Sequence, residues 1–376
     1  MILSTALALI SIAYLILINR MRRAWINTPQ AGVLKYVPDV SIVVVFRNEA
    51  KNLVNLLNDI HQLETDDAEI EIILINDQSE DNGVKLINTW NRGKKLNIRI
   101  ETLFAVSNAH KKEGIELGLA HASHEYIAVT DADCRLPKTW LKTMVTVNPK
   151  RLRCGPVCYQ SKNTLASKIL ELELMGLSAM ASSTIAMKKP ILANAANMSY
   201  SRTLFFEVGG YETKVKNQSP SGDDIDLMRR VFSKHKSAIR YVKHPNALVK
   251  TELPQNVREF FNQRLRWAGK TKFSAFKPGS GLTLVLLIFY TMQFMIPIYL
   301  MFQFDLILLI VWLTSLALKL AVDYWYFKPI LKFYDMRNLL RYLPLTELFH
   351  LLYVVPVGIV SIFVPYSWKG RKLKHG

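Results

Sequence analysis

The sequence is poor in cysteine, in acidic residues and in repeated or low-complexity segments. Three cysteines occur in 376 residues, Cys134, Cys154 and Cys158. Their number is odd and their spacing matches no metal-ligand pattern, so a disulfide scaffold and a zinc site are both disfavoured. We therefore expect three reduced thiols. The chain is long enough for one large domain or two small ones.

The shortage of acidic residues leaves a strongly basic chain. It has 48 lysines and arginines against 30 aspartates and glutamates, a net charge of +18. Such a balance suits a polyanionic partner, namely a nucleic acid, an anionic membrane surface or a phosphorylated substrate. The basic residues lie mainly beside apolar segments rather than in a stripe interleaved with aromatic residues, and this disfavours nucleic-acid binding.

The N-terminal apolar segment lacks the features of a cleavable signal peptide. Ile2 to Ile18 are uncharged, and Arg20, Arg22 and Arg23 follow them. No basic residue precedes the apolar run and no small-residue cleavage site follows it. This predicts an uncleaved transmembrane anchor over residues 1–20. Because basic flanks stay on the inner side, the following residues, to about 280, are expected in the cytoplasm.

Two further apolar runs are long enough to span a membrane. Leu282–Phe304 is uncharged, and Leu306–Phe327 returns toward the same side. Lys319 and Asp323 in the second run are spaced i, i+4, so we expect them to pair on one helix face.

A last apolar run, Leu348–Tyr366, is interrupted by Pro356 and Pro365 and followed by the basic segment Trp368–Lys374. A crossing would place that basic segment outside, whereas a re-entrant or interfacial helix would keep it inside, in line with the charge rule. The sequence slightly favours the second arrangement. It predicts a C-terminal membrane region over residues 282–366, with two spans plus a third spanning or re-entrant segment, in a multi-pass protein of the cell membrane.

The part between the apolar ends alternates between strand and helix patterns. The predicted strands are Ser41–Phe46, Glu69–Ile75, Ile98–Leu103 and Tyr126–Thr130, and the predicted helices are Asn52–Leu63, Val84–Trp90 and Lys111–Ala122. This order predicts an α/β domain over residues 39–275 with a mostly parallel sheet. Ligands bind beyond the carboxyl ends of such strands, so the polar residues there are the candidates for function.

Asp131 and Asp133 follow the fourth predicted strand. Residues i and i+2 of a strand point to the same face, so both carboxylates can converge on one cation. Mg²⁺ and Mn²⁺ prefer carboxylate oxygen and keep coordination sites open for substrate phosphates. The alternative is a solvated turn, since this short pattern is common.

A second acidic cluster contains Asp223, Asp224 and Asp226 and precedes a helical pattern from Leu227. One interpretation is a general base that takes a proton from an acceptor hydroxyl, with Asp223 or Asp224 as the catalytic residue. The other is an ordinary helix N-terminus, where the dipole favours carboxylates. Local spacing alone does not choose between the two aspartates.

The segment Gln263-Arg264-Leu265-Arg266-Trp267 is the third candidate. In a helix, Gln263, Arg266 and Trp267 share one face, which could bind a diphosphate through Arg266 and a sugar ring against the indole. An amphipathic helix on the membrane surface is the other interpretation, and both can hold.

Asp77 and Lys111 complete the set. Asp77 ends the second predicted strand, where it could accept hydrogen bonds from a nucleobase or cap a turn. Lys111 and Lys112 open a helix, a place where the dipole disfavours cations, so an anion nearby would explain them.

Together these residues resemble the inverting family-2 glycosyltransferases, and specifically the membrane-bound group of cellulose, chitin, hyaluronan and poly-N-acetylglucosamine synthases. The resemblance runs from about Ser41 to Trp267, through SIVVVFRNEAKN, INDQSED, KKEGIELGL, the Asp-Ala-Asp motif, NAANMSYSRTLFFEVGGY and Q-x-x-R-W. It implies a GT-A domain that binds a UDP-sugar and Mg²⁺ or Mn²⁺. Asp77 would contact uracil, Lys111 the nucleotide, Asp131 and Asp133 the metal, and Asp224, beside Asp223, would be the base.

The sequence departs from this family at two positions and in length. Asn76 stands where many members have a further aspartate, and Glu116 where many have asparagine. The C-terminal membrane region has too few spans for an obvious polymer channel, which puts processive synthesis in doubt. A helper subunit, or a short glycan or a lipid-linked product, would fit as well.

Two other functions compete with this hypothesis. A sugar nucleotidyltransferase shares a similar α/β core, but its expected glycine-rich phosphate loop is missing between Ser41 and Asn52. A non-catalytic membrane scaffold that binds nucleotide is the other, and the intact acidic and basic motifs argue against it.

Overall fold

The computed structural model describes residues 1–105, 108–211, 222–271, 281–364, 366–369 and 371–373. The chain divides into two compact units, which we describe separately. The helical unit comprises Met1–Asn27, Lys162–Gly176 and Pro254–Tyr366, and the sheet unit comprises Thr28–Ser161, Leu177–Leu253 and Ser367–Gly376. The expected end of the α/β domain at residue 275 lies outside the described residues.

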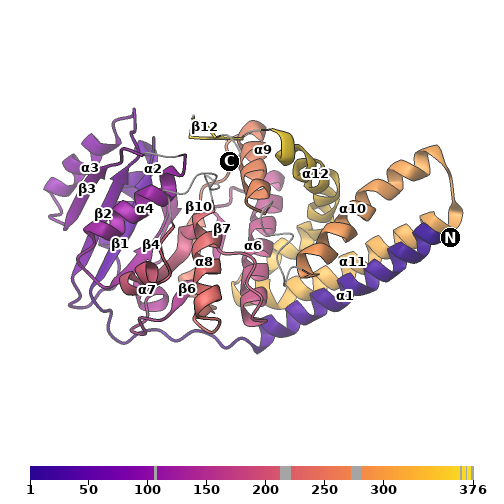
Figure 1. The fold of residues 1–376 in the computed structure, drawn as a ribbon, viewed down its shortest axis with the longest axis horizontal. Coiled ribbons are helices and arrows are strands. Elements are labelled where there is room, and N and C mark those ends of the chain that lie inside the picture. Colours follow the sequence, from indigo (N-terminus) through magenta and orange to yellow (C-terminus); the bar gives the residue numbers. More distant parts are fainter. Residues whose placement is uncertain (106–107, 212–221, 272–280, 365, 370, 374–376) are drawn as a thin grey trace. The chain divides into compact units, whose positions relative to one another are not determined.

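A seven-stranded sheet forms the centre of the sheet unit, with strand order β3-β2-β1-β4-β8-β6-β9 (Figure 1). Its strands are β1 (Val40–Phe46), β2 (Ile70–Asn76), β3 (Ile98–Thr102), β4 (Tyr126–Val129), β6 (Leu152–Cys154), β8 (Met198–Ser201) and β9 (Ile239–Tyr241). Strands β3, β2, β1 and β4 are parallel to one another, and β6 is parallel to β9. Strand β8 runs antiparallel to both β4 and β6. The predicted α/β class with a mostly parallel sheet is confirmed.

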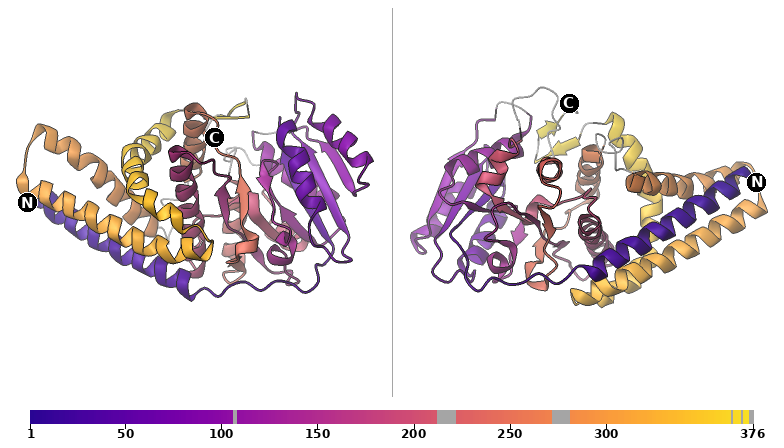
Figure 2. Two further views of the ribbon diagram at one scale, coloured as in Figure 1. Left: turned by 180° about the vertical axis from the view of Figure 1, so that it is seen from behind. Right: turned by 60° about the horizontal axis from the view of Figure 1, so that its bottom comes forward.

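The first half of this sheet follows the pattern in the sequence closely. Helices α2 (Ala50–His61), α3 (Gly83–Arg92) and α4 (His110–His121) connect the parallel strands, and every predicted boundary agrees within two residues. Strand β1 is buried over its whole length because its side chains are mostly β-branched and both faces of the sheet are covered. Figure 2 shows the helices against the sheet in two further views.

The rest of the sheet unit consists of short elements. These are β5 (Cys134–Arg135), β7 (Val157–Tyr159), β10 (Val249–Thr251), β11 (Tyr366–Trp368), β12 (Arg371–Leu373), α5 (Trp140–Met144), α7 (Arg202–Glu207), α8 (Asp223–Lys234), and the 3₁₀ turns η1 (Ala195–Asn197) and η2 (Pro245–Ala247). Strands β5, β10 and β7 form a second sheet, and β11 pairs with β12. The three cysteines are buried thiols.

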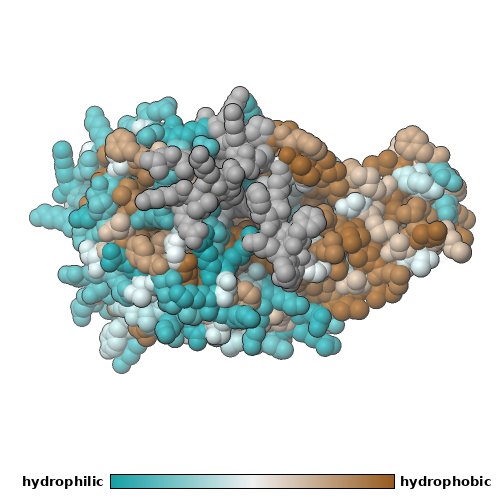
Figure 3. All heavy atoms as spheres, in the orientation of Figure 1, coloured by the Kyte–Doolittle hydropathy of each residue, from teal (hydrophilic) through white to brown (hydrophobic). Residues whose placement is uncertain are grey.

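The helical unit contains the long apolar helices at both ends of the chain, together with the polar helix α9 and the short turn η3. They are α1 (Ile2–Asn27), α9 (Val257–Thr271), α10 (Gly281–Phe302), α11 (Leu306–Phe333), η3 (Arg337–Tyr342) and α12 (Leu343–Phe363), together with the start of α6 (Leu165–Ala186). Helices α1 and α11 lie side by side (Figures 1 and 2). Hydrophobic side chains cover the visible surface of α1, α10 and α11 (Figure 3).

Five helices in the described residues are long and apolar enough to cross a membrane, namely α1, α6, α10, α11 and the segment Arg337–Phe363. Helix α6 is not among the spans predicted from the sequence. Its neighbours in the chain, β7 and β8, are both strands of the sheet unit. Both ends of α6 therefore lead into one folded unit, and its apolar residues are explained by burial.

Polar residues in the helical unit point inward and bind one another. Lys319 Nζ lies 2.6 Å from Asp323 Oδ2 and also contacts Glu347, and the Tyr14 hydroxyl donates to both oxygens of Asp323 at 2.8 and 2.9 Å. Ser11 and Ser315 lie 2.7 Å apart. The predicted pairing of Lys319 with Asp323 is confirmed, and it joins α11 to α1 and α12.

Candidate active site

The candidate site begins at the carboxyl ends of three neighbouring parallel strands. Strands β2, β1 and β4 are adjacent in the sheet, and their ends lead into Asp77, Glu49 and Asp131. Because parallel strands end at the same edge, these side chains approach one another although they are far apart in the sequence. Arg47 reinforces this edge by donating from Nη1 to the backbone oxygens of Asp77, at 2.9 Å, and Gln78.

The turns after β1 and β2 have an uncommon backbone conformation. Asn48 and Gln78 both have a φ of +52°, in the left-handed region that residues other than glycine rarely adopt. Asn48 Oδ1 accepts from the Glu80 amide at 2.8 Å, and the Asn48 amide donates to Ser79 Oγ at 3.1 Å. The two turns hold each other in place, as is common at functional sites.

Asp77 is fully buried and held by Arg371 and His110. His110 Nδ1 lies 3.0 Å from Asp77 Oδ1, and Arg371 Nη1 donates to both carboxylate oxygens at 2.7 Å. Arg371 also donates from Nη2 to Gln78 Oε1 at 2.8 Å. Burial alone would raise the pKa of Asp77, but the bonds from His110 and Arg371 outweigh it and lower the pKa below its usual value.

The segment after α12 supplies a second contact to the same edge. Lys369 Nζ contacts Glu49 Oε1, and Arg47 Nε donates to the Lys369 backbone oxygen at 3.3 Å. Glu49 is itself buried and accepts from Asn52 Nδ2 at 2.8 Å. The sequence predicts these basic residues as a membrane flank, because nothing in their local spacing indicates contact with the sheet.

Asp131 and Asp133 lie in the turn between β4 and β5, not within a strand. The argument from alternating strand faces is therefore wrong for this pair, and the turn brings the two carboxylates near each other instead, closed by the Cys134 amide donating to the Asp131 oxygen at 3.1 Å. Burial, together with the negative charges of Asp131 and Glu49, raises the pKa of Asp133 to about 6.

Lys111 joins the two predicted acidic motifs. Its Nζ lies 2.5 Å from Asp131 Oδ1 and 3.6 Å from Asp223 Oδ2. Burial alone would lower the pKa of Lys111, but the negative charges of Asp131, Asp223 and Asp224 raise it above its usual value. The anion that the sequence predicted beside this helix start is thus present as carboxylates of the protein itself.

The second acidic motif forms the first turn of α8. Gly222 precedes it with a φ of +94° and provides no side-chain cap, and Asp223 and Asp224 are both buried. Asp224 Oδ1 accepts from the Ile225 amide at 2.8 Å. Neither aspartate occupies the N-cap position, so a simple cap does not explain them, although the helix dipole favours carboxylates in this turn.

Gln263, Arg266 and Trp267 lie on α9, in the helical unit. The central cation there is Arg264, which binds Glu173 through two hydrogen bonds of 3.0 and 2.6 Å and is buried. Gln263 Oε1 accepts from Arg264 Nη1 at 2.6 Å, and the guanidinium carbon lies 4.4 Å from the centre of the Trp267 ring. Two of the three predicted residues therefore surround an arginine that the sequence analysis did not select.

Two family models match the chain. The model for glycosyl transferase family 2 matches residues 41–149, and the model for glycosyl transferase family group 2 matches residues 126–363. Because the second match covers more than half of the chain, the chain belongs to the family-2 group of glycosyltransferases. The resemblance inferred from the motifs is confirmed at this level.

Curated relatives agree with this assignment. A probable glycosyltransferase of Sulfolobus acidocaldarius is 26% identical over 62% of this chain and 50% of its own length. Poly-beta-1,6-N-acetyl-D-glucosamine synthase of Staphylococcus epidermidis is 24% identical over 62% of this chain and 54% of its own length. The chain thus spans about half the length of the curated relatives it matches.

A solved structure has the same fold. The mannosyltransferase of Pyrobaculum calidifontis, in complex with GDP-Man and Mn²⁺, aligns with a TM-score of 0.53 and 16% identity, over 92% of this chain and 98% of that chain. This likeness confirms the GT-A fold and carries no information on ligands at that identity.

Proposed function

We propose that this protein is a membrane-bound, metal-dependent, inverting glycosyltransferase. It would transfer a hexose or N-acetylhexosamine from a UDP-sugar to a glycan or a lipid-linked acceptor. The family assignment argues against the nucleotidyltransferase alternative. The intact acidic cluster, with its dedicated lysines, argues against a non-catalytic scaffold.

The observation that carries this proposal is the role of the start of α4. Three consecutive residues there, His110, Lys111 and Lys112, contact acids from three different elements of the sheet unit: Asp77, Asp131 with Asp223, and Asp226. Side chains that we propose to bind the nucleobase, the diphosphate and the acceptor thus all lie around the N-terminal end of α4. A structural core has no need for so many carboxylates in one place.

Asp131 and Asp133 fit a magnesium or manganese ion. Both offer oxygen ligands. Burial, together with repulsion from Asp131 and Glu49, raises the pKa of Asp133, and a bound cation would offset both effects. No group of three or more ligating side chains occurs among the described residues. Two carboxylates with open positions are what an ion shared with substrate phosphates requires. When bound, the ion would neutralise charge that develops on the leaving diphosphate.

The protein's own residues account for the remaining steps. Asp77 would accept a hydrogen bond from the nucleobase. Lys111 would exchange its contact with Asp131 for one with the diphosphate. Asp224 would take the proton of the acceptor hydroxyl as that oxygen attacks the anomeric carbon. The bond to the diphosphate breaks on the opposite face, so the configuration of the sugar inverts. The resemblance to the family's Q-x-x-R-W motif gives Gln263, Arg266 and Trp267 a role in substrate binding.

The identity of the donor nucleotide has one specific alternative, GDP in place of UDP. The solved relative from Pyrobaculum calidifontis holds GDP-Man, whereas the motifs resemble enzymes that use UDP-sugars. We favour UDP, because the buried carboxylate of Asp77 is where the motif places the uracil contact.

The proposed location is the cell membrane, with the sheet unit in the cytoplasm. Helix α1 would cross once, and α10 and α11 would cross as a pair, so that α12 begins on the cytoplasmic side. The ion pairs of Lys369 and Arg371 with Glu49 and Asp77 support a re-entrant or interfacial α12, because they place the segment after α12 beside the sheet unit.

The direct test is a donor panel with purified, full-length protein. UDP-glucose, UDP-N-acetylglucosamine, UDP-galactose and GDP-mannose are compared for nucleoside diphosphate release, with Mn²⁺ and with chelator. We expect release from one UDP-sugar that stops when the metal is removed. Release from GDP-mannose alone would show that the donor nucleotide is GDP and not UDP. No release with any donor and acceptor extract would refute the catalytic proposal.

A further inference from the structure

Lys112 is the member of the α4 cluster that the proposed reaction does not use. Its side chain is 4% exposed, and its Nζ lies 3.0 Å from Asp226 Oδ2. The ring of Tyr211 is centred 5.9 Å from the same nitrogen. An ammonium group so deeply buried at a helix N-terminus is doubly unfavourable, since burial and the helix dipole both oppose its charge. Its pairing with Asp226 therefore has to compensate both effects.

Helix α4 is a firm base for this lysine. A Cβ atom at Gly114 would lie 2.8 Å from Val45 Cγ1, and one at Gly118 would lie 2.5 Å from Val43 Cγ1. These two glycines share one helix face and let the α4 backbone rest directly on β1. Glu116 adds a further tie, because its Oε1 accepts from the Tyr211 amide at 2.9 Å. The side chains of Lys111 and Lys112 thus project from a helix whose backbone is held at a fixed distance from β1.

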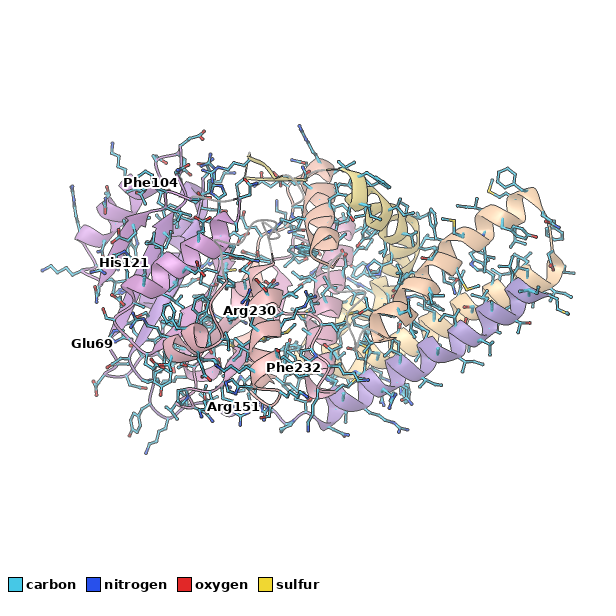
Figure 4. All side chains as sticks on the ribbon, in the orientation of Figure 1. Glu69, Phe104, His121, Arg151, Arg230 and Phe232 are labelled. Carbon is cyan, nitrogen blue, oxygen red and sulfur yellow. The ribbon has the colours of Figure 1, made fainter. Side chains whose placement is uncertain are left out.

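The acids of α8 are arranged around Asp224. Asp223 and Asp226 are spaced i, i+3 and share a helix face, whereas Asp224 is turned by about 100° from Asp223. Lys111 faces Asp223 at 3.6 Å and Lys112 faces Asp226 at 3.0 Å. The adjacent lysines of α4 therefore hold the carboxylates on either side of Asp224 in the sequence. Arg230 lies one turn further along α8 (Figure 4). It adds a contact to Asp226 at 3.4 Å.

Gly222 adds no side-chain contact at the start of this turn. Helix α8 starts after Gly222, in the left-handed conformation and without a side-chain cap. Because glycine is conformationally permissive, the contacts made by the side chains of the first turn of α8 set the orientation of that turn. We propose that Lys112 and Asp226 are positioning residues, whose ion pair sets the rotation of the first turn of α8 and thereby aims Asp224 at the acceptor hydroxyl. This inference rests on the proposed function, in which Asp224 is the base.

A purely stabilising ion pair is the competing explanation, and kinetics separate the two. Small displacements of a catalytic group cost large factors in rate, because reaction needs near-attack geometry. In full-length protein, Lys112→Met and Asp226→Asn should each lower kcat by about tenfold or more, and leave the Kd for UDP within about twofold. Lys112→Arg should restore most of kcat, since it keeps the charge. Lys142→Met is the matched control, because it removes a lysine that bonds Asp66 at 3.0 Å elsewhere in the sheet unit.

Loss of folding is controlled by the double variant Lys112→Met with Asp226→Leu. Replacing both members avoids leaving the buried Lys112 ammonium without Asp226, and apolar replacement of a whole ion pair is often neutral for stability, although Arg230 loses its 3.4 Å contact with Asp226. The double variant should melt near the wild-type temperature and still show the low kcat. Wild-type kcat in a folded double variant, or a raised Kd for UDP in the single variants, would overturn the positioning role.

Asp224→Asn in the same assay separates this inference from the function on which it rests. If Asp224→Asn retains full turnover, the proposed base is wrong. If it abolishes turnover while the Lys112 and Asp226 variants keep theirs, only the positioning role is wrong.

Discussion

Arg371 and Asp77 form an ion pair in which one guanidinium nitrogen bonds both carboxylate oxygens at 2.7 Å. The two residues are 294 positions apart. Arg371 follows the last apolar helix, whereas Asp77 ends the second strand of the sheet, so the pair closes a very long loop of chain. Because both residues belong to the sheet unit, we expect the segment after α12 and the candidate active site to lie on one side of any membrane that the chain crosses.

The first prediction concerns this topology. Cysteine replaces Lys369, Phe104 or Phe302 one at a time; Phe104 lies on the surface of the sheet unit (Figure 4), and Phe302 ends α10. In sealed vesicles of one orientation, an impermeant maleimide should label the first two from the same side and the third only from the other side. The native cysteines are buried and give little background. Labelling of Lys369→Cys together with Phe302→Cys would mean that α12 crosses.

The second prediction separates the two buried aspartates of α8. Asp224→Asn should lower kcat by about 10²–10⁴-fold, the contribution typical of a general base, with the Kd for UDP unchanged. Asp223→Asn should cost less, because Asp223 faces Lys111 at 3.6 Å and acts through that lysine. Both are measured by UDP release and by calorimetric titration with UDP. A larger loss of kcat in Asp223→Asn than in Asp224→Asn would show that Asp223 is the general base.

The strands and helices before Asp131 could be predicted from the sequence because their signals are local. Runs such as Val40–Phe46 are apolar on both faces, and α2 buries Leu53, Leu56, Leu57 and Ile60 at helical spacing. The order of parallel strands then brought Asp77 and Asp131 to one edge without any further information. Short strands such as β5 and β7 carry too few residues for a pattern and were not predicted.

The missed residues of the site share a physical cause. Lys369 and Arg371 contact Glu49 and Asp77 through tertiary structure alone, so their spacing in the sequence contains no signal of the pairing. Arg264 was passed over in favour of Arg266, because a helical wheel gives faces but not the neighbour that covers each face. The partner that buries Arg264, Glu173 on α6, is 91 positions away.

The third prediction concerns the contact of α4 with the sheet. Gly118→Ala places a methyl group 2.5 Å from Val43 Cγ1, which should cost about 1–3 kcal/mol as overpacking and lower the melting temperature. Gly32→Ala is the control, since nothing lies within 4 Å of a Cβ atom there. Adding Val43→Ala to Gly118→Ala should recover part of the loss by removing the clashing methyl groups. An unchanged melting temperature in Gly118→Ala would show that α4 can move away from β1.

The last prediction uses the raised pKa of Asp133, which is about 6 in the folded protein, against about 3.9 for an unperturbed aspartate. The folded state therefore holds this proton more tightly than the unfolded chain does. It follows that stability contributed by this group is present below about pH 4 and is lost as the pH rises through about 6. Asp133→Asn removes the buried charge, so in chelator it should raise the melting temperature at about pH 8 and have little effect near pH 4.

Manganese ions should reverse the order of the two proteins at the higher pH. Wild-type protein gains stability when an ion binds the Asp131 and Asp133 carboxylates, whereas Asp133→Asn has lost one of the ligands and gains less. Differential scanning fluorimetry at both pH values, with chelator and with Mn²⁺, measures all four states of each protein. Equal melting temperatures of wild type and variant in chelator at the higher pH would show that the charge of Asp133 is not destabilising. Equal shifts on adding Mn²⁺ would show that the ion binds elsewhere.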